Sequence, residues 1–164
     1  QLKMPLRPAS SEDVPELYAM LLELAAFEKM DSGVKITQEQ FADDFNQGRF
    51  SALIVVDEES DKAAAMVLYH VHYNTWHGQI MSMDELLVRP EYRRKKYGKL
   101  LLAAVAKEAK KLKVANIEWT VLNWNEPAIR FYKSVKGVSD LSGSEGWLRY
   151  RMDGEGIADL AGSE

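Results

Sequence analysis

The sequence predicts an α/β fold with a mixed central β-sheet, and three observations support it. Strand-like runs and runs with helical spacing follow one another along the 164 residues. One helical run separates two strand-like runs, so those strands pair in parallel through a crossover, whereas a predicted hairpin pairs antiparallel. The apolar content of 46% and charged content of 28% suit a globular protein, and we expect one domain over residues 1–164.

The N-terminal part predicts an edge strand followed by a helix. Leu2–Arg7 is strand-like, and Pro5 excludes a central position in the sheet because proline has no N–H to donate. Ser10 and Asp13 have the spacing of a capping box, which marks a helix start. The apolar positions of this helix are spaced for one face: Val14, Leu17, Tyr18, Leu21, Leu24 and Ala25.

The middle of the chain predicts a short helix and then a hairpin. Thr37 and Gln40 resemble a second capping pair, before a helix that carries two phenylalanines. Phe50–Asp57 and Ala63–Tyr73 are rich in β-forming residues, and the polar Glu58–Lys62 segment between them reads as the turn.

The C-terminal half predicts the crossover and two further elements. Gln79–Val88 is the strand that enters the crossover, and its helix ends near Lys113. Val114–Val121 is the strand that leaves it. We then expect a short helix over Glu126–Ser134 and a final strand around Trp147–Met152.

Four consecutive cations, Arg93–Lys96, stand between the strand and the crossover helix. Cations at a helix start oppose the helix dipole, whose positive end lies there. An anion bound to the free N–H groups of the helix start would explain the arrangement, as in phosphate sites. The alternative is a solvated charge run without a ligand.

Composition excludes several other functions. There is no cysteine, so disulfides and zinc–thiolate sites are absent, and cytoplasm is the expected location. His70, His72 and His77 lack a carboxylate or cysteine at metal-site spacing, so we expect no metal and interpret them as structural. The net charge of −4 argues against nucleic acid as a partner. No apolar stretch reaches membrane-spanning length.

The basic turn and a later segment resemble the GCN5-related N-acetyltransferase (GNAT) superfamily. Arg93–Gly98 is similar to its pyrophosphate loop, Arg/Gln-x-x-Gly-x-Gly/Ala, with Lys96 where the first glycine is usual. Leu122–Lys133 resembles the Asn…Phe-Tyr helix of its diamine acetyltransferase family. Further matches extend the resemblance from about Leu6 to about Gly162: Glu23–Glu28, Tyr73–Trp76, Asp84–Glu85 and Ser144–Trp147.

The resemblance implies a GNAT fold, in which two strands of the mixed sheet splay apart between flanking helices and acetyl-CoA lies between them. It implies acetyl-CoA and no metal as cofactor, a small-molecule amine as substrate, and a homodimer. The implied cofactor-binding residues are Leu86, Leu87, Val88, Arg93, Arg94, Lys95, Lys96, Tyr97, Gly98, Lys99, Asn125, Glu126, Pro127, Ala128 and Tyr132. The backbone of Leu86–Val88 would also supply the oxyanion donor, although as plain sequence these residues are core.

The catalytic residues implied by the resemblance are Tyr132 and Asp84. Tyr132 would protonate the departing thiolate, because a phenol with a pKa of about 10 carries its proton at neutral pH. The alternative for Tyr132 is packing with Phe131 on a short amphipathic helix. Asp84 would orient the amine and take its proton through water. Because Asp84 and Glu85 are adjacent, we expect them on opposite faces of a strand.

The substrate-binding residues implied by the resemblance are Phe27, Glu28, Asn74, Trp76, Asp84 and Glu118. Glu118 interrupts an apolar strand, where a charge is costly unless paired or solvated. Glu28 could equally be an exposed acid beside Lys29. Asn74-Thr75-Trp76 is closer to the thialysine N-epsilon-acetyltransferase branch than to the spermidine/spermine branch, which carries an acid at the position of Asn74. A protein amine as acceptor, and an impaired CoA-binding module, stay open as alternatives.

Overall fold

The computed structural model describes residues 5–146 and 150–162 of the chain. The chain forms two compact units, residues 1–122 and residues 123–164. The described sheet lies in the first unit, and helices α4 to α6 lie in the second. Because compact units can fold together, the expectation of one domain over residues 1–164 stays a prediction.

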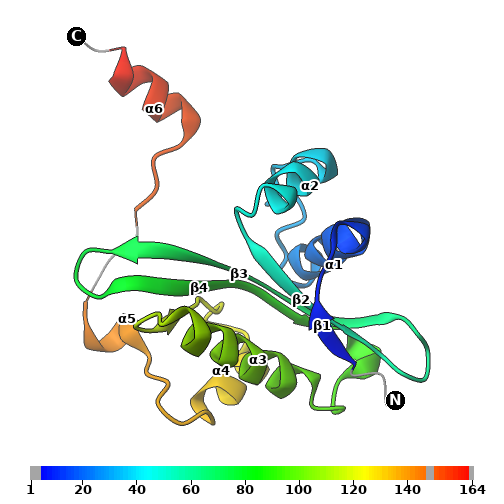
Figure 1. The fold of residues 1–164 in the computed structure, drawn as a ribbon. Helices are drawn as coiled ribbons and strands as arrows, with labels where there is room; N and C mark the ends of the chain where they lie inside the picture. The colour runs from blue at the N-terminus through cyan, green and yellow to red at the C-terminus, as the bar shows by residue number, and fades with distance from the viewer. Residues whose placement is uncertain (1–4, 147–149, 163–164) are drawn as a thin grey trace. The chain divides into compact units, whose positions relative to one another are not determined.

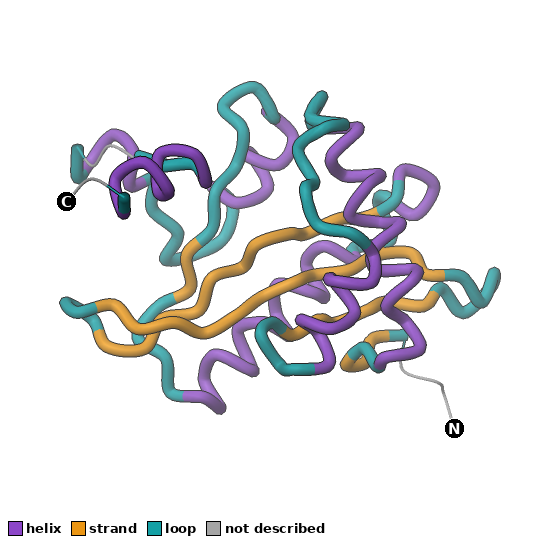
Figure 2. The backbone as a smooth tube through the Cα atoms, turned by 90° about the horizontal axis from the view of Figure 1, so that it is seen from above, coloured by secondary structure: helices purple, strands orange, loops and turns teal. Residues whose placement is uncertain are grey.

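Five strands form the described sheet, in the order β1-β2-β3-β4-β5. They are β1 Leu6–Pro8, β2 Ser51–Val56, β3 Ala63–Asn74, β4 Gly78–Val88 and β5 Ile117–Glu118. The strands β1 to β4 pair antiparallel, β5 pairs with β4 in parallel, and the mixed sheet is therefore confirmed. β1 lies at the edge as predicted, although residues 2–4 of the expected strand lie outside the described residues. Figure 2 shows β3 and β4 side by side as a long hairpin.

The helices of the first unit cover both faces of its sheet (Figure 1). One face carries α1 Val14–Phe27 and α2 Gln38–Asn46, and the other carries α3 Tyr97–Leu112, which connects β4 to β5. Two short 3-10 helices, η1 Ser11–Asp13 and η2 Pro90–Tyr92, precede α1 and the basic turn. The three α-helices thus occupy the positions that the apolar spacing predicts.

The predicted caps position the first two helices. Asp13 accepts a hydrogen bond from the Ser10 N–H at 2.7 Å and completes the capping box before α1. The same carboxylate binds the Arg7 guanidinium, with contacts of 2.7 Å and 2.8 Å. The bond from Arg7 is the main reason why the pKa of Asp13 falls to about 2. Thr37 caps α2, because its hydroxyl accepts from the Gln40 N–H at 3.2 Å.

The main core lies between α1, α2 and the sheet face that they cover. Leu17 and Met20 of α1 are fully buried and belong to one cluster with Met66 and Leu68 of β3 and Leu87 of β4. Each such side chain contributes about 1.5–3 kcal/mol of burial free energy. On the helix of the other face, the buried residues are Leu101, Leu102, Val105 and Ala109.

Arg89, the residue after β4, ties α1 to the end of this strand. Its guanidinium donates to the carboxylates of Glu16 and Glu23, each at 2.6 Å, and to the Ala63 carbonyl at 2.8 Å. Hydrogen bonds from Arg89 to Glu23 and then to Glu16 raise the pKa of this guanidinium above its usual range. α1 is thereby fixed to the end of β4 through its first turn, at Glu16, and through its second half, at Glu23.

The last strand of the crossover is shorter than the predicted Val114–Val121. Its pairing begins with a bond from the Ala115 N–H to the Gln79 carbonyl at 2.8 Å, and the ladder ends where Glu118 pairs with Ser82. Residues 119–122 form no strand. A strand persists only while its neighbour offers hydrogen-bond partners, and β4 becomes irregular just beyond Ser82.

The second unit contains α4 Glu126–Lys133, α5 Leu141–Ser144 and α6 Gly154–Ala161. The predicted helix over Glu126–Ser134 is confirmed to within one residue. Of the expected strand around Trp147–Met152, residues 147–149 lie outside the described residues. The strand prediction is wrong for residues 150–152, which have no regular structure and pair with no strand of the described sheet.

Candidate active site

A β-bulge in β4 organises the candidate acceptor site. Leu68 of β3 pairs with Glu85, but the next residue, Tyr69, pairs with Met83, so Asp84 is the extra residue of β4. In a regular strand, neighbouring side chains would point to opposite faces. The bulge interrupts that alternation, and this overturns the expectation that Asp84 and Glu85 lie on opposite faces of the sheet.

Both carboxylates lie on the sheet face that α1 covers. Glu85 is opposite Leu68, which belongs to the core beneath α1. Asp84 accepts a hydrogen bond of 2.6 Å from His70 Nδ1. His70 is two residues from Leu68 on β3 and therefore shares its face.

Glu118 joins the same face from the neighbouring strand. Ser82 of β4 pairs with His70 on one side and with Glu118 of β5 on the other. Paired residues of adjacent strands project to the same face of a sheet. His70, Ser82 and Glu118 thus form a row across three strands, next to Asp84.

The pKa of Glu85 is strongly raised on this face. Burial, followed by the negative charges of Glu28 and Asp84, raises the pKa of Glu85 to about 7. Burial also raises the pKa of Glu28. Sequence reasoning did not include Glu85 among the site residues, although an acid just before the apolar Leu86–Val88 was a usable signal.

Phe27 and Arg93 connect the end of α1 to the basic turn. The Arg93 guanidinium carbon lies 5.6 Å from the centroid of the Phe27 ring, a cation–π geometry. Arg93 Nε also donates to the Val88 carbonyl at 3.3 Å. A predicted substrate residue and a predicted cofactor residue are thus in contact at the end of β4.

Asn74 shapes the turn between β3 and β4. Its side-chain oxygen accepts from the N–H groups of Trp76, at 2.9 Å, and His77, at 3.1 Å. The Trp76 residue itself is 78% exposed. These two predicted substrate residues therefore lie at the hairpin tip, four residues along β3 from His70.

Among the strands of the described sheet, the second half of β4 has one neighbour. Its pairing with β5 ends at Ser82, whereas its pairing with β3 continues to Val88. The predicted cofactor segment Leu86–Val88 lies in this half. One edge of its backbone is therefore unpaired by any strand of the described sheet, which is the arrangement that splayed strands produce.

The basic turn has an unusual backbone for its sequence. Arg94 and Lys96 have φ angles of 73° and 64°, the left-handed region that glycine occupies most easily. For other residues this conformation costs about 1–2 kcal/mol each. Lys96, which stands at the usual glycine of the loop motif, is also the N-cap of α3.

The N–H groups of this turn are available to a ligand. Within the described part of the chain, five of them donate no hydrogen bond: those of Arg94, Lys96, Tyr97, Gly98 and Lys99. Left-handed residues alternating with extended or helical ones make anion-binding concavities of such N–H groups. The turn thus combines free donors, positive charge and a helix N-terminus, the chemistry that a pyrophosphate needs.

Two side chains of the turn point to Asp57, at the end of β2. Lys95 Nζ and the Tyr97 hydroxyl donate to Asp57 Oδ1 at 2.8 Å and 2.7 Å. Ser60 donates to Oδ2 from its N–H and its hydroxyl. The bonds from Lys95 and then Tyr97 hold the pKa of Asp57 well below its usual range. The ammonium of Lys95 is thus paired with the internal carboxylate of Asp57 and also with the exposed Glu59. The residues Arg94, Lys95, Lys96 and Lys99 are all exposed.

The predicted residues of the second unit lie on α4. Asn125 is its N-cap, and the side-chain oxygen accepts from the Ala128 N–H at 3.4 Å. Pro127 stands in the first turn, where its missing N–H costs nothing. The rings of Phe131 and Tyr132 have centroids 5.3 Å apart. The cap that the sequence predicts for this helix is confirmed.

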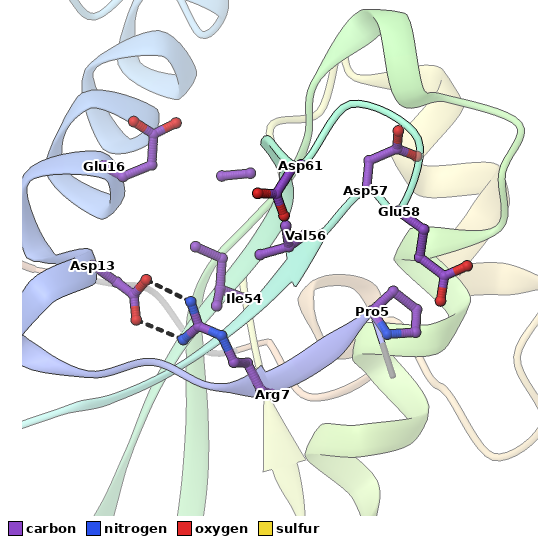
Figure 3. Close-up of a pocket in the computed structure, with 10 residues that line it drawn as sticks. Pro5, Arg7, Asp13, Glu16, Ile54, Val56, Asp57, Glu58 and Asp61 are labelled. Atoms are coloured by element: carbon purple, nitrogen blue, oxygen red, sulfur yellow. Dashed lines mark hydrogen bonds and ion pairs between the residues drawn. The ribbon is translucent and has the colours of Figure 1, made fainter. Parts of the chain in front are cut away.

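A separate pocket of about 760 Å³ lies where β1, β2 and the start of α1 meet (Figure 3). It is lined by Pro5, Arg7, Asp13, Glu16, Ile54, Val56, Asp57, Glu58, Asp61 and Ala63. Figure 3 shows Arg7 bound to Asp13 on one side, with Glu58 on the other. None of the residues predicted to bind cofactor or substrate lines this pocket.

Within residues 5–146 and 150–162, no three or more histidine or acidic side chains gather as a metal site would require. No helix of the same ranges has both the length and the apolar character needed to cross a bilayer.

A parallel crossover that begins with an N–H-rich basic turn is the arrangement that the resemblance implies, and family comparison agrees. The model of the acetyltransferase (GNAT) family matches residues 15–137. The chain belongs to this family of acetyltransferases.

Within this family, the chain is similar to enzymes with a named acceptor. The chain is 39% identical over 140 residues to a thialysine N-epsilon-acetyltransferase of Caenorhabditis elegans, covering 85% of each chain. It is 33% identical over 157 residues to the enzyme of that name from Mus musculus, covering 91% of this chain and 92% of the relative. Among solved structures, an integron cassette protein of V. cholerae has a TM-score of 0.73 at 22% identity, covering 96% of this chain and 97% of that one, which supports the fold.

The left-handed backbone at Lys96 leads to a prediction about stability. In Lys96→Gly, relief of about 1–2 kcal/mol should outweigh an unfolded-chain entropy cost of about 0.5–1 kcal/mol. We expect the free energy of unfolding in urea to rise by up to about 1 kcal/mol. The matched control is Lys99→Gly, in the helical first turn of α3, which should lose about 0.5–1 kcal/mol. Equal destabilisation of both variants would contradict the left-handed assignment.

Proposed function

We propose that this protein is an acetyl-CoA-dependent N-acetyltransferase that acts on the primary amine of a small amine or amino acid such as thialysine. The observation that carries the proposal is the acidic face of the sheet, where Asp84, Glu85 and Glu118 lie together. Such a face suits a cationic acceptor. Relatives named as thialysine N-epsilon-acetyltransferases, at 39% and 33% identity, support the substrate class.

The residues of the basic turn fit the pyrophosphate of acetyl-CoA. The free N–H groups from Arg94 to Lys99 would bind its oxygens, and the exposed side chains of Arg94 and Lys96 would neutralise its charge. The unpaired backbone edge of Leu86–Val88 would bind the arm and supply the oxyanion donor. Residues Asn125 to Ala128, at the start of α4, complete the proposed set. When bound, acetyl-CoA supplies the acetyl group as a thioester.

The acidic face would bind the amine and remove its proton. Asp84, held by His70, and Glu118 attract the ammonium form of the acceptor, and Glu28, Phe27 and Trp76 complete the proposed binding set. The amine must lose a proton before it can attack a carbonyl carbon. Asp84 remains a proposed acceptor of this proton through water, as the resemblance implies. Glu85 is a second proposed acceptor, because a pKa of about 7 suits a base that works near neutral pH.

Tyr132 is the proposed general acid. Its hydroxyl would give its proton to the departing sulfur, so that a thiol leaves instead of a thiolate. The support is the family membership together with the position of Tyr132 on α4, seven residues after the capping Asn125. A homodimer, which the resemblance implies, and a cytoplasmic location, which the sequence predicts, stay proposals.

A second candidate is a polyamine acceptor. A spermidine/spermine N(1)-acetyltransferase-like protein of Homo sapiens is 27% identical over 155 residues, covering 90% of this chain and 22% of that protein. Several carboxylates on one face could bind more than one ammonium group. A protein amine as acceptor, or CoA binding without turnover, are the remaining alternatives.

A thiol-release assay with acetyl-CoA tests the proposed activity directly. The panel of acceptors is thialysine, lysine, ornithine, putrescine and spermidine, each compared with a reaction without acceptor. We expect turnover to be fastest with thialysine. Fastest turnover with spermidine would favour the second candidate, and CoA binding without any turnover would reduce the protein to a binding module.

Loss of the Tyr132 hydroxyl should impair chemistry and leave cofactor affinity intact. In Tyr132→Phe we expect kcat to fall by about 10²–10⁴-fold, the usual contribution of a positioned acid. The affinity for acetyl-CoA, measured by calorimetry, should change little. The control is Tyr150→Phe, an 87% exposed tyrosine of the same unit. A Tyr132→Phe variant with near-normal kcat would assign this ring to packing.

The raised pKa of Glu85 predicts a pH dependence. Below pH 7 this carboxyl carries a proton and cannot accept another, so kcat/KM should rise with pH through about 7. Glu85→Gln should remove this limb of the profile and lower kcat/KM by about 10²-fold or more. The exposed Glu39→Gln serves as control and should keep the limb. Persistence of the limb in Glu85→Gln would place the base elsewhere.

A charge at Asn74 should separate the two candidate acceptors. Asp can form the same turn, so Asn74→Asp adds a carboxylate without removing the Trp76 and His77 bonds. A partly exposed ion pair contributes about 0.2–1 kcal/mol, so kcat/KM for spermidine relative to thialysine should rise a few-fold at fixed ionic strength. An unchanged or lower ratio would remove Asn74 from the acceptor site.

A further inference from the structure

Asp57 is a buried carboxylate with no part in the proposed chemistry. It is 2% exposed, the one buried charged residue among the described residues. It lies in the turn between β2 and β3, and its partners Lys95 and Tyr97 come from a segment about forty residues further along the chain. A charge is buried in this way only when its hydrogen bonds compensate the lost hydration.

Along the basic turn, residues that bind the β2–β3 turn alternate with the two left-handed residues. Tyr92, Lys95 and Tyr97 all attach to the β2–β3 turn: the Tyr92 hydroxyl lies 2.9 Å from Ser60 Oγ, and the other two bind Asp57. Arg94 and Lys96, between these anchors, are the two left-handed residues and are exposed. The anchors therefore flank each strained residue on both sides.

Left-handed lysine and arginine persist only where the surroundings determine the conformation. The turn has no glycine at these two positions and no side-chain cap at Lys96. Asp57 binds both Tyr97 and Lys95, whose ammonium also contacts Glu59 at 3.1 Å, and these bonds fix the backbone of Lys96 between the two residues. That backbone carries the free N–H groups proposed to bind pyrophosphate.

We propose that Asp57 is a positioning residue for acetyl-CoA, which holds the basic turn in the shape that presents its N–H groups to the pyrophosphate. This inference rests on the proposed function. Asp57 would thereby compensate for the absence of glycine at position 96. Its hydrogen bonds to the neighbouring residues fix a left-handed backbone that glycine would adopt freely.

The test compares the KM for acetyl-CoA with kcat and with the acceptor KM. In Asp57→Asn we expect the KM for acetyl-CoA to rise about tenfold or more, with kcat at saturating acetyl-CoA and the acceptor KM within about twofold. Tyr97→Phe removes one bond to Asp57 and should raise the same KM about threefold. This second variant carries the test if Asp57→Asn does not fold.

Two controls separate positioning from general stability. Asp13→Asn removes a carboxylate that stabilises the start of α1 and makes no contact with the basic turn, so its melting temperature should fall without a change in the KM for acetyl-CoA. Glu59→Gln removes the exposed second partner of Lys95 and should be neutral. If Asp57→Asn and Tyr97→Phe behaved like Asp13→Asn, Asp57 would have only a structural role.

The outcome for the wild-type protein keeps the two proposals apart. A wild-type protein that releases no thiol and binds no CoA by calorimetry would contradict the proposed function. A wild-type protein that does both, with the KM for acetyl-CoA unchanged in both Asp57→Asn and Tyr97→Phe, would contradict the inference about Asp57 alone.

Discussion

The single extra residue in β4 is the constraint on which the candidate acceptor site depends. Without the bulge at Asp84, a shift of one residue would turn every side chain from there to Val88 onto the other face. Leu87 would leave the core beneath α1, and Glu85 would leave the neighbourhood of Glu28. With the bulge, two adjacent carboxylates occupy one face. Burial there raises the pKa of Glu85, and the negative charges of Glu28 and then Asp84 raise it further. The same strand, β4, thus presents the two acids and, just before them at Ser82, ends its parallel pairing with β5.

The basic turn meets a different requirement. It must leave the backbone N–H groups at the start of α3 free for a ligand, whereas in most helices a capping side chain accepts hydrogen bonds from such groups. Lys96 occupies the N-cap position without a capping side-chain hydrogen bond. Its backbone is left-handed, a conformation in which the Cβ lies too close to a backbone carbonyl oxygen. Asp57 balances this by binding the residues on either side. The positive charge of the segment is divided as a result: Lys95 neutralises an internal carboxylate, and the exposed Arg94 and Lys96 are proposed to face the ligand. In the sequence the four cations Arg93–Lys96 look equivalent, whereas in the fold Arg93 lies over Phe27 and Lys95 binds Asp57.

Local patterns predicted most of the fold. Pro5 marked the edge strand, Thr37 and Asn125 marked helix starts, and apolar spacing located α1 and α3. Effects between distant segments were not predictable. Nothing in Met83–Val88 signals a bulge, because pairing with β3 creates it. The early end of β5 follows from its neighbour, and a buried Asp57 looks like an ordinary turn acid in sequence. Glu85 was missed as a site residue for the same reason, since strand alternation placed it on the wrong face.

The most direct test of this account is a carboxyl-carbon NMR titration of Glu85 in the resting protein. If the bulge places Glu85 beside Asp84 on a partly buried face, its pKa should be about 7, and Asp84→Asn should lower it. Asp13 provides an internal reference within the same spectrum, with a pKa of about 2. A Glu85 carboxyl that titrates near its ordinary value of 4.5, and does not respond to Asp84→Asn, would contradict the arrangement of the acidic face and the proton acceptor derived from it.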